Sequence, residues 1–211
     1  MLLVAALGAA SLAVVPAVSS AGPGVTTCSG TLAPGDYQKV VVPSGAVCLS
    51  NGPVTVRGGL FVGSEATFVL GSEENQTLTG TISGGVHAVD AASVQIHFTT
   101  INGGIDVQGG AGPFGGPFDV TWNTIEDSQI NGSVTMSGYD GFWMGFIRNH
   151  VNGSVTLNDN VLADPDGNEY VTNVIHGSLN CSGNSPAPQV GDSEGNLNVV
   201  TGAKTGQCAT L

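Results

Sequence analysis

The segment INGSVTMS, residues 130–137, decides the fold, because five other stretches of the chain repeat its pattern. Each copy reads apolar–any–Gly–small–apolar–any–apolar–any. The other copies are VRGGLFVG from Val56, ISGGVHAV from Ile82, INGGIDVQ from Ile101, VNGSVTLN from Val151 and IHGSLNCS from Ile175. The starts at 56, 82, 101, 130, 151 and 175 are 26, 19, 29, 21 and 24 residues apart. Units of this size cannot bury an apolar face alone, so such repeats are typical of solenoids, in which neighbouring units supply the core.

The second half of each octet alternates apolar and polar residues, as in Val155–Thr156–Leu157, which indicates a strand with one buried face. Gly at the third position fits a tight bend in which φ can be positive. Further alternating runs lie between the octets, namely SVQIHF (93–98), FDVTW (118–122), FWMGFI (142–147) and EYVT (169–172). The sequence therefore predicts an all-β, single-domain parallel β-helix of about six coils. Right-handed winding is favoured, because the strict six-residue period of left-handed β-helices is absent.

Polar residues stand two positions before the apolar start of several bends, which predicts a hydrogen-bonded ladder along the solenoid. Its expected members are Thr99, Asn123, Asn149 and Asn173. Asn123 enters this set only if Ile125 starts the bend and residues 126–129 are an insertion. Asn160 and Asn184 would form a second, shorter ladder. The alternative interpretation is that Asn simply favours turns.

The composition excludes some functions and points to export. The 211 residues include 16 acidic and 4 basic side chains, a formal net charge of −12, and the scattered cations argue against a nucleic-acid partner. Residues 2–18 form an uncharged apolar run followed by small residues, which predicts a signal peptide over 1–21 and a mature domain over 22–211. Cleavage after Ser19 and a retained membrane anchor are the alternatives. We expect an extracellular monomer without membrane contact after cleavage.

The four cysteines are an even number in an exported chain, which predicts disulfides. Three pairings are possible. We favour Cys28–Cys48 and Cys181–Cys208, because each pair closes a short loop at one end of the chain. No pair has the CxxC spacing of a zinc site. Residues 25–55 are expected to form an N-terminal cap, 56–182 the repeat coils and 183–211 a C-terminal cap.

Several segments resemble a family of secreted actinobacterial proteins that are right-handed parallel β-helices of pectin-lyase-like type. The resemblance rests on TTCSGTLAPGDY (26–37), GPFDVTWNTI (116–125), MGFIRN (144–149), CSGNSPAPQVGD (181–192) and TGAKTGQC (201–208). It covers nearly the whole mature chain, and the two cysteine-bearing ends are its most specific parts. The resemblance implies the fold and export, but no activity and no catalytic residues.

One outward-facing row of side chains is expected where the octets stack, because the residue between two inward apolar positions points outward. We take this row, with one residue of the next, as a candidate ligand-binding face: Phe61, His87, Asp106, Gln108, Thr135, Thr156 and Asn180. His87 and Asp106 would lie on strands about 4.8 Å apart and are weak candidates for an acid–base pair. An ordinary cross-strand pair on a solvated face is the favoured interpretation.

Oxygen ligands gather in one short segment, at Asp164, Asp166, Asn168 and Glu169, which makes it a weak candidate for calcium. Gly stands at the fourth place of this segment rather than the sixth, and a plain turn explains the residues equally well. No other cofactor is expected. Trp122 and Trp143 are interpreted as core or loop packing rather than as sugar platforms. Phe142–Trp143 is left open as an exception, because a bulged loop at Gly138–Gly141 precedes it.

The function favoured by the sequence is a non-enzymatic structural protein, or one that binds neutral glycans or the cell envelope. The acidic balance argues against anionic polymers as partners. The alternative is an extracellular polysaccharide lyase or glycoside hydrolase that uses the exposed face of the repeat strands. Hydrolysis needs two carboxyl groups about 5–9.5 Å apart. Asp106 supplies the only carboxylate in the expected row, so nothing in the sequence requires catalysis.

Overall fold

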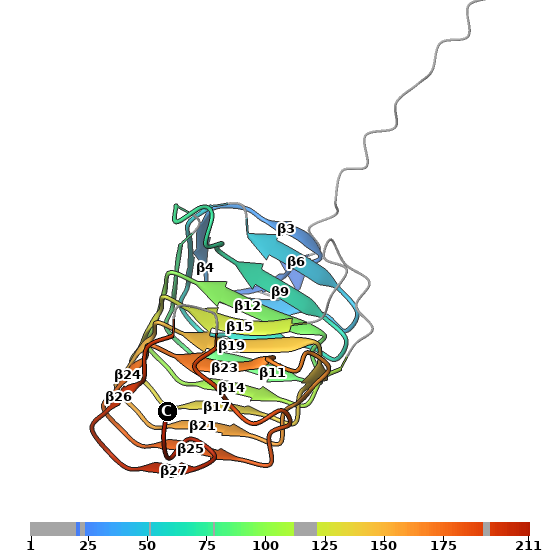
Figure 1. Ribbon diagram of the computed structural model, residues 1–211. Helices are drawn as coiled ribbons and strands as arrows, with labels where there is room; N and C mark the ends of the chain where they lie inside the picture. Colours follow the sequence, from blue (N-terminus) through green and yellow to red (C-terminus); the bar gives the residue numbers. More distant parts are fainter. Residues whose placement is uncertain (1–19, 22–23, 51, 78, 112–121, 192–194) are drawn as a thin grey trace, which may run out of the picture.

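The computed structural model describes residues 20–21, 24–50, 52–77, 79–111, 122–191 and 195–211. They form an all-β structure with three large sheets (Figure 1). Most of the expected signal peptide (residues 1–19) and most of the run at 118–122 lie outside the described residues. Within the described part of the chain, no helix has the length and apolar character needed to cross a membrane.

Sheet A carries the repeat octets. Its ten strands lie in the order β1-β2-β5-β8-β11-β14-β17-β21-β25-β27, and all neighbours are parallel except β1 and β2. The strands are β1 (Ser20–Ala21), β2 (Val25–Thr27), β5 (Lys39–Val42), β8 (Leu60–Val62), β11 (Val86–Val89), β14 (Ile105–Gln108), β17 (Val134–Ser137), β21 (Val155–Asn158), β25 (Leu179–Ser182) and β27 (Lys204–Gly206).

Sheet B contains runs that the sequence placed between the octets. Its seven parallel strands lie in the order β23-β19-β15-β12-β9-β6-β3. They are β3 (Gly30–Leu32), β6 (Val47–Ser50), β9 (Thr67–Leu70), β12 (Ser93–His97), β15 (Trp122–Glu126), β19 (Trp143–Ile147) and β23 (Asn168–Val171).

Sheet C is built from short strands just before the octet bends, in the order β26-β24-β20-β16-β13-β10-β7-β4. They are β4 (Gly35–Tyr37), β7 (Val54–Val56), β10 (Gly80–Ile82), β13 (Thr99–Ile101), β16 (Gln129–Ile130), β20 (His150–Val151), β24 (Val174–Ile175) and β26 (Val199–Val200). A fourth, two-stranded sheet pairs β18 (Asp140–Gly141) with β22 (Val161–Leu162).

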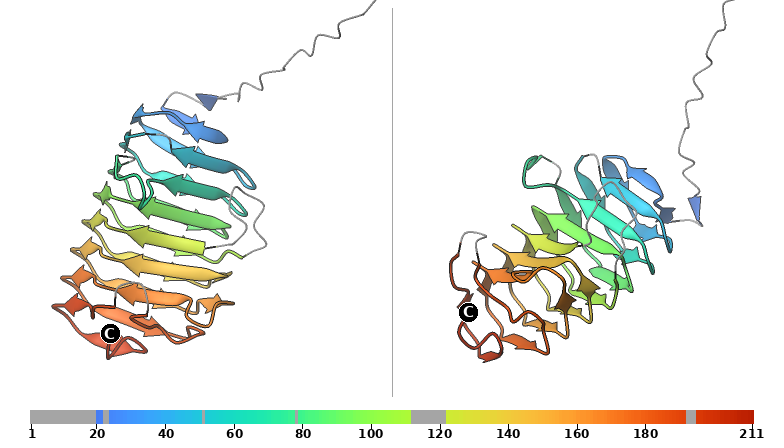
Figure 2. Two further views of the ribbon diagram at one scale, coloured as in Figure 1. Left: turned by 45° about the horizontal axis from the view of Figure 1, so that its top comes forward. Right: turned by 45° about the vertical axis from the view of Figure 1, so that its right-hand side comes forward.

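The chain visits the three large sheets in rotation. From β5 to β16 each strand in sheet A is followed by one in sheet B and one in sheet C, so every third strand returns beside an earlier one. Figure 2 shows the resulting layers of parallel strands. This arrangement is consistent with a parallel β-helix.

The strand pairings confirm the alignment of the octets. Val86 of β11 lies opposite Leu60 of β8 and Ile105 of β14, and the same position recurs along sheet A. These inward residues are buried between the sheets, where they form one continuous apolar core.

The third-position glycines are required for a different reason from the one expected. Gly84, Gly103 and Gly132 do not have positive φ. A Cβ added at Gly84 would instead lie 2.5 Å from the backbone of the previous bend, and one at Gly132 would lie 2.6 Å from it. Successive bends therefore pack backbone against backbone, and the repeated Gly is a requirement for close approach.

A hydrogen-bonded ladder runs along the inside of the bends, but Asn123 is not part of it. The Asn149 amide N–H and Nδ2 both donate to Asn173 Oδ1, at 2.9 and 3.2 Å. Ser128 occupies the place predicted for Asn123, since Ser128 N–H donates to Asn149 Oδ1 and Thr99 N–H donates to Ser128 Oγ.

The expectation for Asn123 was wrong because residues 126–129 are not an insertion. Ile125 is an inward residue of β15, and Ile130 is the true start of the bend, opposite Ile101. Asn123 points into the core as well, where its Oδ1 accepts from the backbone N–H of Val94 at 2.7 Å.

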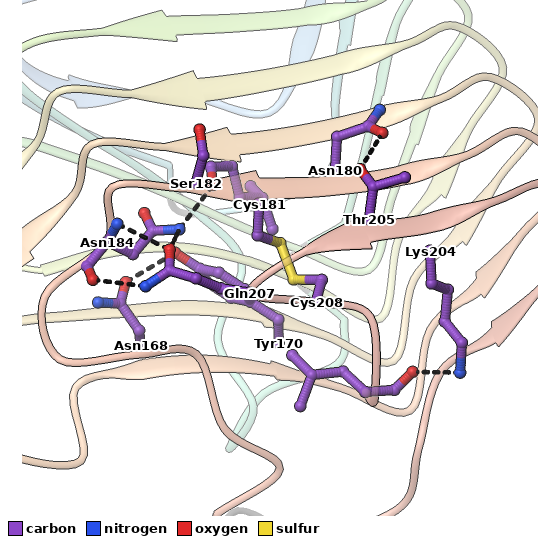
Figure 3. The surroundings of a disulfide bond; sticks show 12 residues. Asn168, Tyr170, Asn180, Cys181, Ser182, Asn184, Lys204, Thr205, Gln207 and Cys208 are labelled. Carbon is purple, nitrogen blue, oxygen red and sulfur yellow. Dashed lines mark hydrogen bonds between the residues drawn. A yellow bond between two sulfur atoms is a disulfide. The ribbon is translucent and has the colours of Figure 1, made fainter.

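Both ends are closed by the predicted disulfides, Cys28–Cys48 and Cys181–Cys208, with Cα–Cα distances of 5.6 and 5.3 Å. Figure 3 shows that the second disulfide lies beside Gln207, which extends the Asn160–Asn184 ladder by accepting from Asn184. Residues 25–55, expected as a cap, contribute strands to all three large sheets, and the segment after 183 adds β26 and β27.

Candidate functional site

The expected row on sheet A exists, but it holds no acid–base pair. His87 lies opposite Asp106 in the register, as predicted. The Asp106 carboxylate instead accepts from Gln108 Nε2, at 2.9 and 3.1 Å. The exposed His87 ring stacks on Phe61 with ring centroids 5.1 Å apart, and Lys39 Nζ lies 3.8 Å from the centre of the Phe61 ring. The remaining members of the row, Thr135, Thr156 and Asn180, lie side by side along sheet A.

The four residues proposed for calcium do not converge. Asp164 Oδ1 accepts from the Asp166 backbone N–H, as in an Asx turn. Asn168 points inward, where its amide contacts Tyr170 and the Pro186 carbonyl. Glu169 lies on the opposite face of β23. The alternation of side chains along a strand separates Asn168 from Glu169, so this segment is a turn leading into β23 and the calcium site is not formed.

A cavity of about 440 Å³ lies instead over the outer face of sheet B. Its floor is formed by outward-pointing residues of β12 and β15, and the segment after β9 forms one wall. The lining residues are Val69, Gly71, Ser72, Glu73, Glu74, Gln95, His97, Trp122, Thr124, Glu126 and Trp143.

Four charged side chains meet beside this cavity, and two of them, Glu73 and Glu126, line it. Arg148 binds Asp127 with two hydrogen bonds, Nε to Oδ1 at 2.8 Å and Nη2 to Oδ2 at 2.9 Å. Its Nη2 also pairs with Glu126 Oε2 at 3.3 Å and with the Glu73 carboxylate. One guanidinium therefore joins three carboxyl groups, of which Glu126 is buried and Glu73 belongs to an exposed segment.

The two glutamates of this cluster have pKa values shifted in opposite directions. Burial raises the pKa of Glu126 from its ordinary 4.5 to about 8, against the hydrogen bond donated by Thr124. The hydrogen bond with the Glu126 carboxyl lowers the pKa of Glu73, and Arg148 lowers it further. At neutral pH Glu126 therefore holds a proton and donates it toward the Glu73 carboxylate.

His97 lies beside this pair. Its Nδ1 lies 3.6 Å from Glu126 Oε2. This nitrogen is buried and has no hydrogen-bond partner among the described residues. Burial lowers the pKa of His97 despite the nearby carboxylates. The imidazole is therefore neutral near pH 7.

Trp143 packs flat on the outer face of sheet B, at the edge of the cavity. A Cβ at Gly145 would fall 2.2 Å from Trp143 Cη2, so the indole covers this glycine. Its Nε1 donates to Glu169 Oε1 at 3.2 Å. Trp122, opposite Trp143 in the register, also lines the cavity. Both tryptophans are only partly buried and offer aromatic surface to a ligand.

Local backbone geometry brings the cluster together. Asp127 and Arg148 occupy equivalent corners of neighbouring coils, directly after β15 and β19, and both have left-handed backbones with φ of 50° and 55°. Glu73 comes from a longer connection, because Leu70 and Ile82 are 12 positions apart whereas Ile125 and Ile130 are 5 apart.

Sequence reasoning missed this site because it followed only the octets. A usable signal was present, since TWNTIEDSQI (121–130) and FWMGFIRNHV (142–151) align at the same spacing of 21 residues as their octets. That alignment stacks Trp122 with Trp143 and places Glu126 on the outer face.

The carboxyl groups of Glu73, Glu126 and Asp127 approach within 4.8 Å of one another, a spacing that a metal ion could use. Arg148 already supplies positive charge to all three, so we assign no metal to them.

The chain matches no protein-family model, no curated protein and no solved structure. Its class is defined by fold and site: an all-β protein of stacked parallel sheets, carrying two disulfides and a carboxyl-rich, tryptophan-flanked cavity on sheet B.

Proposed function

We propose that this chain is a secreted, single-domain, right-handed parallel β-helix that binds a glycan in the sheet B cavity and hydrolyses its glycosidic bonds. The observation that carries this proposal is the Glu73–Glu126 pair, whose pKa values are shifted in opposite directions inside a cavity flanked by two tryptophans. Such pairs are typical of acid–base sites.

Export and handedness rest on separate grounds. Two disulfides are typical of oxidising compartments, and the apolar run at 2–18 supports secretion. Right-handed winding is supported by the strong preference of parallel β-crossover connections for that hand.

In the proposed reaction Glu126 donates its proton to the glycosidic oxygen while the bond from that oxygen to C1 breaks. The electron pair of this bond goes to the leaving oxygen. A water molecule attacks C1, and the Glu73 carboxylate accepts the proton that the water loses. One water is consumed and two shorter sugars are released. Proton transfer from Glu73 to Glu126 then restores the starting state.

The two carboxyl groups must separate to admit substrate. Their nearest oxygens lie within 4.8 Å of each other, whereas hydrolysis by direct attack of water uses carboxyl groups about 6.5–9.5 Å apart. The Glu73 side chain is 58% exposed and that of Glu126 only 5%. Glu73 is therefore the member that a substrate would displace, while Glu126 stays fixed on β15.

A second candidate function is glycan or cell-envelope binding without catalysis through the row on sheet A, by a monomeric protein. The observation that favours it is the continuous stack of Lys39, Phe61 and His87 beside aligned polar side chains. An aromatic ring with an adjacent polar row suits a neutral sugar, and it needs no carboxyl pair.

Incubation of the purified protein with a panel of polysaccharides, followed by measurement of new reducing ends, tests the first function. We expect Glu126→Gln and Glu73→Gln to lower kcat by about 10²–10⁴-fold, while Asp140→Asn, an exposed carboxylate on β18, leaves it unchanged. Activity should fall above pH 8 as Glu126 loses its proton.

Product formation that survives Glu126→Gln contradicts the hydrolytic function. Binding without product that is lost in His87→Ala and Asp106→Asn, but not in Glu126→Gln, would instead establish the second function.

A further inference from the structure

We propose that the glycan of this cavity carries free amino groups, as in a de-N-acetylated hexosamine polymer, because the carboxylates of Glu73 and Glu74 line the cavity and no cationic side chain is available for a sugar acid. The inference rests on the proposed function and adds the chemical class of its ligand.

The supply of cations excludes a uronate or a sulfated sugar. The whole chain has four Lys and Arg residues, and only Arg148 lies at the cavity. Recognition of an anionic sugar relies on charge-assisted hydrogen bonds from such groups, and Arg148 is already held by Asp127, Glu73 and Glu126. The other three are engaged elsewhere: Lys39 over Phe61, Arg57 with Asp36, and Lys204 with the Leu211 carbonyl.

The carboxylates leave an excess of negative charge for a ligand ammonium. Glu73 and Glu74 project from the segment after β9, and Asp127 lies beside Glu126. Glu74 is exposed and has no cationic partner among the described residues. With Glu126 protonated, the carboxylates of Glu73, Glu74 and Asp127 and the guanidinium of Arg148 together give a local charge of 1 − 3 = −2. The net charge of −12 would also attract a polycation over longer distances.

His97 gives independent evidence for a ligand donor. The residue is 7% exposed, and its Nδ1 has no hydrogen-bond partner. Buried polar atoms are normally hydrogen-bonded. A neutral imidazole with its proton on Nε2 presents Nδ1 as an acceptor, so Nδ1 can accept an N–H or O–H from a sugar but cannot pair with a carboxylate oxygen.

Intrinsic fluorescence reports directly on occupancy of this cavity, because Trp122 and Trp143 are the only two tryptophans of the chain and both line it. The experiment titrates the purified protein at pH 6 with four probes of equal length: a glucosamine oligomer, its fully N-acetylated form, a neutral glucan and a uronate oligomer. Oligolysine of the same charge serves as a non-sugar control.

We expect the glucosamine oligomer to bind at least about tenfold more tightly than its N-acetylated form, which corresponds to about 1.4 kcal/mol. The preference should shrink in 0.5 M NaCl, since salt screens exposed charges. It should also shrink by about threefold in Glu74→Gln, but not in Asp140→Asn. The comparison between ligands uses the wild-type protein, so it does not depend on how the variants fold.

Equal or tighter binding of the N-acetylated, neutral or uronate oligomer would overturn the inference, as would equal quenching by oligolysine. The hydrolytic function fails separately. Cleavage of neutral glycans that depends on Glu126 keeps that function and removes the amino-sugar class, whereas selective binding of the glucosamine oligomer without cleavage does the reverse.

Discussion

Replacement of Glu126 by Gln is expected to remove a pH dependence of stability that the wild-type protein shows above neutral pH. The folded-state pKa of Glu126 is raised from 4.5 to about 8 by burial. A carboxyl with a raised folded pKa contributes stability that is fully present below pH 4.5 and is lost as pH rises through about 8. Gln has nearly the same shape as the protonated acid and does not titrate.

The magnitude follows from proton linkage. Each pH unit between the two pKa values changes the unfolding free energy by about 1.4 kcal/mol. Integrated from pH 6.5 to 9, the wild-type protein should lose about 2 kcal/mol.

This window isolates Glu126 from the groups that face it. His97 has a lowered pKa, so its contribution is lost only as pH falls below its ordinary 6.5. Glu73 also has a lowered pKa and acts below its ordinary 4.5. The guanidinium of Arg148 stays charged throughout and remains paired with Asp127.

Urea unfolding of the wild-type protein, Glu126→Gln and the control Asp140→Asn at pH 6.5, 7.5, 8.5 and 9 measures the effect. Glu126→Gln should unfold with nearly constant free energy across the series, whereas Asp140→Asn should follow the wild-type protein. Parallel curves for the wild-type protein and Glu126→Gln would refute the assignment of a buried, protonated carboxyl at this position.

Three further substitutions test other parts of the argument. Arg148→Ala should destabilise the fold by about 2 kcal/mol in urea unfolding, because it leaves carboxylates unneutralised. Arg148→Lys should restore less than half of this stability, because Lys cannot form the two-bond pair with Asp127. Full restoration by Lys would contradict the importance of that pair. Asn173→Ala should lower the unfolding free energy by about 3 kcal/mol, because it removes buried hydrogen bonds, whereas the exposed Asn131→Ala should lower it by less than about 1 kcal/mol. Similar losses in the two variants would show that the buried ladder contributes no more than exposed Asn side chains do. Gly145→Ala should push the Trp143 indole off the sheet, shift its emission and weaken glycan binding about fivefold, with unfolding free energy within about 1 kcal/mol; unchanged emission would show that the ring does not rest there.

The sequence predicted those features of the fold that follow from the periodicity of the strands, namely which residues point inward and which strand positions are paired. Alternation in the octets predicted the inward positions and therefore the register of the octet strands of sheet A, β8 to β25, including His87 opposite Asp106. It did not predict what these side chains do, because Asp106 has a closer donor in Gln108 and His87 an aromatic neighbour in Phe61. Register sets which Cα atoms are adjacent, whereas side-chain partners depend on local competition.

The sequence did not predict the cavity, because the alternation of polar and apolar residues is irregular in sheet B, as Asn123 illustrates. In the strands of sheet B, polar residues such as Asn123 and Asn168 occupy inward positions together with apolar residues. A pattern search that equates apolar with inward therefore loses the register of sheet B. Hydrogen bonds inside the core offset part of the cost of burying them: Asn123 Oδ1 accepts from the Val94 N–H, and Asn168 Nδ2 donates to the Pro186 carbonyl.

The two carboxyl groups of the site are held by different kinds of constraint, and this division bears on function. Glu126 is fixed by the pairing of β15 with β12 and β19, where a shift of one residue would turn every side chain to the other face. Glu73 lies in a connection that the register does not restrain, and among the described residues its side chain is held by its contacts with Arg148 and Glu126. An acid–base pair that must open by roughly 2 Å or more to admit substrate and water needs one rigid and one movable member. A stacked fold supplies the first from a strand and the second from a lengthened turn, without disturbing the coils on either side.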